Sequence, residues 1–254
     1  MVYRSCKLLE LVPGASVAAP DAARPSDNEL AARLRGLGPL AILAIVLVLF
    51  PPTVALGGLG GMPFLIPFGA IKVLAWVRLS RTPWHEIGYV RPKSWIVSLI
   101  TGVALGVAFK FLMKAVVMPL LGADPINYAY HFMVGNRGAL FAGIWSMMVA
   151  AGWGEETLYR GFLFERLGKL FGPSAGAKAL IVLLTSAGFA LLHYSEQGLA
   201  GAAQASITGL TFGIIFAITG RLFLPMVMHA AFDLTAIAMI YLNLESKVAH
   251  LVFR

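Results

Sequence analysis

Residues 154–160 place two adjacent carboxylates, Glu155 and Glu156, and one guanidinium, Arg160, inside an otherwise apolar stretch. An ionised side chain near the bilayer centre costs about 2.5–3.5 kcal/mol on insertion scales, so such groups are paired, solvated or used in chemistry. On a helix, Glu156 and Arg160 stand at i and i+4 with the acid N-terminal, the favoured orientation for an ion pair. The spacing therefore predicts a Glu156–Arg160 pair and leaves Glu155 for chemistry. An inert network of all three is the alternative.

Three further polar side chains lie in later apolar stretches: His193, His229 and Asp233. On a helix, His229 and Asp233 fall on one face, one turn apart. A lone histidine in a membrane helix is more often a packing residue than a ligand. Two histidines and an aspartate on two separate spans, together with the paired acids, favour a shared functional site.

A shared site requires these groups to lie at matching depths in the membrane. Glu155 precedes Lys169 by 14 residues, about 21 Å at 1.5 Å per residue, and His193 follows Lys178 by 15 residues, about 22 Å. Glu155 and His193 are therefore level only if the helix carrying Glu155 continues well past Arg160, to about Lys169. The sequence predicts this long helix.

A carboxylate and an imidazole that share a water form a general base, and a second imidazole can donate to a developing oxyanion. This chemistry is typical of hydrolases. The same groups, Glu155, His193 and His229, could instead hold a divalent metal such as zinc, so the cofactor is either none or such a metal. No His-Glu-x-x-His signature is present, and the one cysteine, Cys6, lies too far away to be a nucleophile here.

The composition is that of an integral membrane protein, because 59% of the 254 residues are hydrophobic and only 13% are charged. Long apolar runs predict an all-α, polytopic transmembrane helical bundle, in which buried polar groups must be paired, solvated in a cavity or used. A poorly ordered tail over residues 1–36, interrupted by prolines, is expected to precede one transmembrane domain over residues 37–254. The predicted spans cover about residues 37–56, 62–77, 94–121, 138–169, 178–193, 201–219 and 222–241.

Lysines and arginines gather on alternate loops, fourteen on one side against Arg137 alone on the other. The positive-inside rule then places the N-terminus and the basic loops in the cytoplasm. The net charge of +8 thus faces anionic lipid, and no nucleic acid partner is expected.

The span over residues 94–121 carries two pairs of interest. Gly102 and Gly106 have the small-xxx-small spacing of close helix packing. Lys110 and Lys114 share one face, where we expect snorkelling or pairing, with binding of a substrate carboxylate as the alternative.

Taken together, the three polar groups resemble the motifs of a known family, the CAAX prenyl protease and bacteriocin-processing family of intramembrane endopeptidases. The motifs stand in order on successive spans: Glu155-Glu156-x-x-x-Arg160, Phe189-x-x-x-His193 and His229-x-x-x-Asp233. The resemblance covers about residues 138–241. It implies an all-helical fold of usually eight spans with a conical cavity, and peptide-bond hydrolysis as the reaction.

By motif position, the resemblance implies that Glu155 activates water together with His193, while His229 and Asp233 support the oxyanion. Glu156, Arg160 and Phe189 would be supporting residues. The implied partners are membrane lipid and a membrane-associated or lipidated peptide or protein substrate. Two alternatives stay open: a non-proteolytic protein of the same fold that binds a partner, and a proton-coupled transporter, which predicts an internal repeat that the sequence does not display.

Overall fold

The computed structural model describes residues 25–36 and 64–253, and the regular structure of this part of the chain is entirely helical. The all-helical prediction is therefore confirmed. Cys6 and the predicted first span over residues 37–56 lie outside the described residues. The elements include a helix over residues 64–79. Three short ones are the 3-10 helices η1 (Trp84–Ile87) and η3 (Tyr128–Met133), and α9 (Glu245–Ala249).

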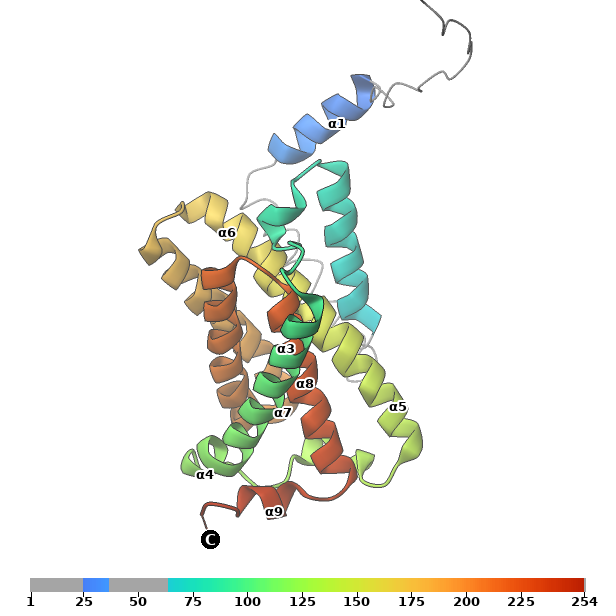
Figure 1. The fold of residues 1–254 in the computed structure, drawn as a ribbon, viewed down its shortest axis with the longest axis vertical. Helices are drawn as coiled ribbons and strands as arrows, with labels where there is room; N and C mark the ends of the chain where they lie inside the picture. The colour runs from blue at the N-terminus through green and yellow to red at the C-terminus, as the bar shows by residue number, and fades with distance from the viewer. Residues whose placement is uncertain (1–24, 37–63, 254) are drawn as a thin grey trace, which may run out of the picture.

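The helices run between two ends of the molecule, which Figure 1 shows at its top and bottom. At the top, the α6 end, lie α1 (Pro25–Gly36) and the connection from α6 (Phe164–Phe171) to the next helix. At the bottom, the α9 end, lie α9, the C-terminus and the short helix α4 (Met118–Leu120).

Within the described residues, three helices are long and apolar enough to cross a membrane: Trp95–Leu120, Ala175–Thr219 and Phe223–Tyr241. The first combines α3 (Trp95–Leu112), a π-helical turn η2 (Met113–Val117) and α4. These helices support the assignment of an integral membrane protein. The count of seven to eight spans stays a prediction.

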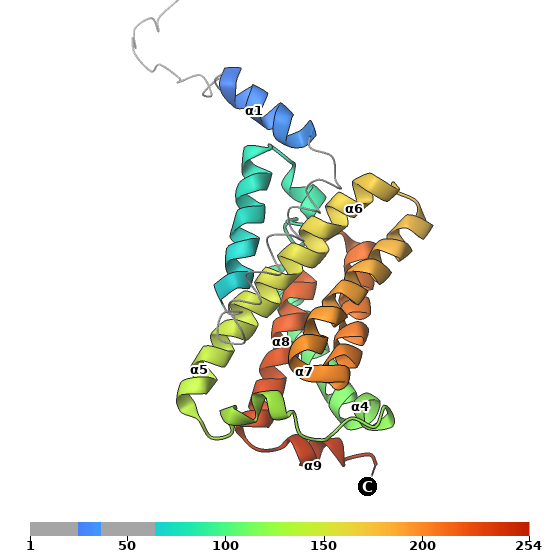
Figure 2. The same cartoon turned by 180° about the vertical axis from the view of Figure 1, so that it is seen from behind.

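The helix α7 (Ala175–Thr219) consists of two arms joined at Gly198, where the backbone turns with φ 64° and ψ −159°. This conformation is essentially restricted to glycine, because a Cβ would clash with the backbone. A Cβ on Gly209 would lie 3.2 Å from Ser186, and one on Gly213 would lie 3.2 Å from Val182, so the arms pack antiparallel (Figure 2). The arms correspond to the spans predicted over residues 178–193 and 201–219.

A continuous helix from Arg137 to Phe171 slants across the molecule in Figure 2. It comprises α5 (Arg137–Trp145), the π-helical segments η4 (Ser146–Glu155) and η5 (Thr157–Leu163), and α6. The prediction that this helix continues through Arg160 to Lys169 is confirmed. π-Helix is rare and occurs mostly as single-turn bulges, which are frequently found at functional sites.

The helix α8 (Phe223–Tyr241) is held between α3 and η4 by glycine contacts. A Cβ on Gly102 would lie 2.7 Å from Val227, and one on Gly106 would lie 2.3 Å from the Met228 carbonyl oxygen. A Cβ on Gly152, in η4, would lie 2.8 Å from Ala230. The prediction of close packing at Gly102 and Gly106 is confirmed, and the backbone of α8 is fixed from two sides.

The last part of the segment expected to be a poorly ordered tail is helical, since α1 covers Pro25–Gly36. Proline is well tolerated in the first turn of a helix, where its missing N–H would have no partner in any case. Pro25 therefore begins this helix and does not break it. Residues 1–24 lie outside the described part of the chain.

We expect Gly106→Ala to destabilise the protein by about 1–3 kcal/mol, because the added methyl group overpacks the α3–α8 contact. Thermal unfolding of the detergent-solubilised protein measures the effect. The matched control is Gly188→Ala, since a Cβ there has no heavy atom within 4 Å. Equal melting temperatures for the two variants would contradict the proposed role of this contact.

Candidate functional site

Glu156 and Arg160 form the buried ion pair that their spacing predicts. Arg160 Nη1 donates to Glu156 Oε1 at 2.8 Å, and the two side chains are 1% and 0% exposed. Arg160 Nη2 also donates to the carbonyl oxygen of Gly209 at 3.1 Å. The guanidinium thus connects the long helix to the second arm of α7.

Aromatic rings surround the Arg160 guanidinium. Its central carbon lies 5.1 Å from the ring centroid of Phe189 and 5.6 Å from that of Phe212. A cation over an aromatic face is attracted by the ring quadrupole, and more strongly where water is excluded. Phe189 therefore helps to hold the arginine in a dry site.

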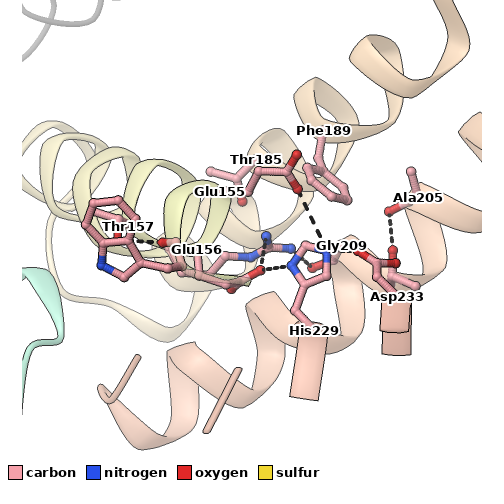
Figure 3. Close-up of polar contacts among 12 residues, drawn as sticks. Glu155, Glu156, Thr157, Thr185, Phe189, Ala205, Gly209, His229 and Asp233 are labelled. Atoms are coloured by element: carbon pink, nitrogen blue, oxygen red, sulfur yellow. Dashed lines mark hydrogen bonds and ion pairs between the residues drawn. The ribbon is translucent and has the colours of Figure 1, made fainter. Parts of the chain in front are cut away.

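His229 faces carboxylates with both of its ring nitrogens (Figure 3). Nδ1 lies 2.7 Å from Glu156 Oε1, and Nε2 lies 3.3 Å from Asp233 Oδ2 and 3.8 Å from Glu155 Oε2. Carboxylates accept hydrogen bonds, so this environment favours a ring that carries protons on both nitrogens. Glu156 therefore orients His229 in addition to neutralising Arg160, a role that the sequence did not indicate.

His193 is oriented by the backbone one turn before it. Its Nδ1 lies 2.9 Å from the carbonyl oxygen of Phe189, which can only accept, so Nδ1 carries the proton. The rings of Phe189 and His193 are packed with centroids 4.4 Å apart. This tautomer leaves Nε2 of the neutral ring as a hydrogen-bond acceptor.

Glu155 lines a cavity of about 140 Å³ together with His193, Asp233 and Tyr159. The Glu155 side chain is 14% exposed, and its Oε2 atom is buried without a hydrogen-bond partner. The structure thus brings Glu155, His193 and Asp233 to one cavity, as the depth calculation requires. His229 lies beside them, in contact with the two carboxylates.

A larger chamber of about 410 Å³ adjoins this cavity, and its walls include Met118 of α4 and Glu245 of α9. The two share part of their walls, including Lys110, Gln204 and Glu196. Lys114 Nζ lies 3.0 Å from Glu245 Oε1, so the expected pairing is found for Lys114. Lys110 Nζ instead donates to the neutral amide oxygen of Gln204 at 3.1 Å. Sequence reasoning missed Gln204 and Glu196, although a polar side chain in a predicted span was a usable signal for Gln204.

A closed set of three hydrogen bonds, among Trp153, Tyr89 and Thr157, attaches the long helix to the loop that follows the helix over residues 64–79. Trp153 Nε1 donates to the Tyr89 hydroxyl at 2.9 Å, and that hydroxyl lies 2.8 Å from Thr157 Oγ1. Because Thr157 Oγ1 donates to the Trp153 carbonyl oxygen at 2.7 Å, Tyr89 is the donor to Thr157. Burial raises the pKa of the Tyr89 phenol, which keeps this donor protonated. These hydrogen bonds fix the two helical turns on either side of Glu155 and Glu156.

The described residues do not provide a set of metal ligands. No group of three or more His, Cys, Asp or Glu side chains among them is arranged to hold a metal ion. A metal ligand must offer a lone pair, and both ring nitrogens of His229 face carboxylates. Glu155, His193 and His229 therefore do not fit a metal in this arrangement.

Comparison with known proteins supports the family resemblance. Residues 137–235 match the family described as type II CAAX prenyl endopeptidase Rce1-like. The matched region contains every motif residue: Glu155, Glu156, Arg160, Phe189, His193, His229 and Asp233. The match supports a protease of the CAAX type, a membrane-bound hydrolase, in general terms. Searches of curated proteins and of solved structures found no match.

We expect Glu156→Ala to yield little folded protein. The substitution leaves the Arg160 guanidinium and the His229 ring buried without their shared acceptor, and breaking a buried ion pair typically costs about 3–5 kcal/mol. The yield of monodisperse protein in detergent and its melting temperature measure the loss.

The control for this prediction is Glu155→Gln, which alters the neighbouring acid but removes no ion pair within 3.5 Å. This variant should keep the wild-type yield and melting temperature. A Glu156→Ala protein as stable as Glu155→Gln would refute the structural importance of the pair.

Proposed function

We propose that the protein is an intramembrane endopeptidase that hydrolyses a peptide bond of a membrane-associated or lipidated substrate, with water activated by Glu155 and His193. The observation that carries this proposal is the buried, unpartnered Oε2 of Glu155 on the same cavity as His193. The family match supports the same general class of reaction.

In the proposed reaction, a water molecule donates one hydrogen bond to Glu155 and the other to Nε2 of His193. Glu155 takes a proton as the water oxygen attacks the carbonyl carbon of the scissile bond, and the carbonyl oxygen becomes an oxyanion. The C–N bond then breaks as the proton passes from Glu155 to the leaving nitrogen. General base catalysis of this kind typically contributes about 10²–10⁴-fold to the rate.

His229 and Asp233 are proposed to support the oxyanion. Nδ1 of His229 is committed to Glu156, which leaves Nε2, 3.3 Å from Asp233 Oδ2, as the donor next to the cavity. An ionised Asp233 can only accept hydrogen bonds, whereas a protonated Asp233 can donate one to the oxyanion. Arg160 and Phe189 act indirectly, because they hold Glu156 and His193 in place.

The membrane setting of this site is part of the proposal. We infer a bundle of seven to eight spans around a polar cavity, with the N-terminus and the basic α6 end in the cytoplasm. The cavity and chamber would then open toward the opposite, α9 end. A substrate would enter from the membrane that carries it.

Purified protein in detergent should cleave at least one member of a panel of lipidated and unlipidated peptides, detected as new termini by mass spectrometry. Glu155→Gln should lower the turnover of that peptide by about 10²–10⁴-fold, because the amide cannot take the proton from water. A transporter or an idle partner-binding protein would generate no new termini. Full turnover by Glu155→Gln would show that Glu155 is not the base.

Replacement of Asp233 separates two roles that its contacts allow. Asp233→Asn should keep at least about a tenth of the activity, because the amide can accept from His229 and donate to the oxyanion at once. Asp233→Ala should lose about 10²–10³-fold in kcat, the usual effect of removing one oxyanion donor. Rates on the cleaved peptide measure both variants. If Asn and Ala variants were equally inactive, donation by residue 233 would be excluded.

A further inference from the structure

Lys110 is a buried cation that forms no ion pair with a carboxylate in the described part of the chain. It is 7% exposed, its Nζ donates to the neutral amide oxygen of Gln204 at 3.1 Å, and it lies 4.5 Å from the Phe232 ring centroid. None of the ion pairs among the described residues involves Lys110. A buried charge normally requires an opposite charge, so this ammonium is unusual.

The neighbouring lysine, Lys114, is neutralised by an ion pair. Lys114 lies one turn further along the same helix, 3.0 Å from Glu245 Oε1, and it also donates to the Pro125 carbonyl oxygen at 2.6 Å. Both lysines line the chamber. The charge of Lys114 is therefore neutralised by an ion pair, whereas Lys110 forms no ion pair with any carboxylate of the described residues.

Lys110 stands where the catalytic cavity and the chamber meet, since it lines both. The carboxylates on the walls are Glu155 and Asp233 in the cavity and Glu196 at the junction, with Asp124 and Glu245 in the chamber. None of these forms an ion pair with Lys110 in the structure. Among the described residues, Lys110 is thus the cation on these walls that forms no ion pair, and it lines the chamber that an anion would enter.

We propose that Lys110 and Gln204 form a subsite that binds a carboxylate of the substrate, on the part of the peptide that occupies the chamber. The inference rests on the proposed function and names a specificity-determining residue for it. The Gln204 amide oxygen accepts from Lys110, which leaves its two N–H donors for the second carboxylate oxygen. A charge-assisted hydrogen bond in a site shielded from water is among the stronger polar contacts.

The chamber has room for the group proposed. Its volume of about 410 Å³ lies in the range of pockets that hold small ligands, and its walls mix apolar side chains with a few polar ones. The carboxylate could be the chain terminus of the substrate or an acidic side chain near it. These two sources share one chemistry, and the experiment below distinguishes them.

The test measures binding without turnover, in protein that carries Glu155→Gln. One fluorescein-labelled apolar peptide is prepared with a free terminal carboxylate, with a terminal amide, and with a terminal amide that follows an added glutamate. Fluorescence anisotropy in detergent gives the three affinities. We expect the free acid to bind at least about tenfold more tightly than the plain amide, and Lys110→Met to remove this difference.

Two further variants make the test specific to Lys110. Lys110→Arg should keep the preference for the acid because it keeps the charge. Lys114→Met removes an equal charge from the same chamber, and it should lower thermal stability yet leave the acid-to-amide ratio unchanged. If the amidated peptide with the added glutamate binds tightly, the subsite accepts a side-chain carboxylate; if it binds weakly, the subsite requires the chain terminus. Either result supports the proposal, provided that Lys110→Met weakens the binding of each peptide that the parent protein binds tightly.

Equal affinities for acid and amide in the parent protein, or an unchanged ratio in Lys110→Met, would overturn the subsite. Because these measurements need no cleavage, their outcome is separate from that of the peptide panel. Absence of new termini would count against the protease, whereas absence of the acid preference would count against the role of Lys110.

Discussion

One carboxylate oxygen, Oε1 of Glu156, holds the centre of this structure together. It accepts hydrogen bonds from Arg160 and from His229, and Arg160 in turn reaches the backbone of Gly209. Three helical segments meet through these contacts: the long helix, α8 and the second arm of α7. Transfer of three ionisable groups out of water is costly, and their mutual contacts offset that cost only in this one arrangement. The chemistry proposed for Glu155 depends on this arrangement.

Local spacing predicted much of this centre. The i, i+4 relation of Glu156 and Arg160, the continuation of their helix to Lys169, and the close packing at Gly106 all follow from the period and rise of a helix. These features need no knowledge of which helices are neighbours. The depth calculation also rests on the helical rise per residue alone. It predicted Glu155 and His193 at equal depth, and both line one cavity in the structure.

Contacts between segments distant in the sequence could not be predicted in the same way. The hydrogen bond from His229 to Glu156 and that from Lys110 to Gln204 depend on how the helices are arranged. The π-helical segments around Glu155 were also missed, because a π-helix places i→i+5 bonds where sequence periodicity assumes i→i+4. The helix over residues 25–36 was missed because prolines were taken as breaks, although one of them begins it.

The glycine contacts on α8 separate the parts of this protein that can vary from those that cannot. Backbone touches side chain or backbone at Gly102, Gly106 and Gly152, so few substitutions there leave the positions of His229 and Asp233 unchanged. The chamber is walled on its far side by α9 and the loop around Asn127, which carry none of the motif residues. Evolution could therefore alter that wall, and with it the proposed substrate subsite, while the groups proposed for hydrolysis stay in register. Related chains that act on different substrates should accordingly diverge in this wall before they diverge in α8.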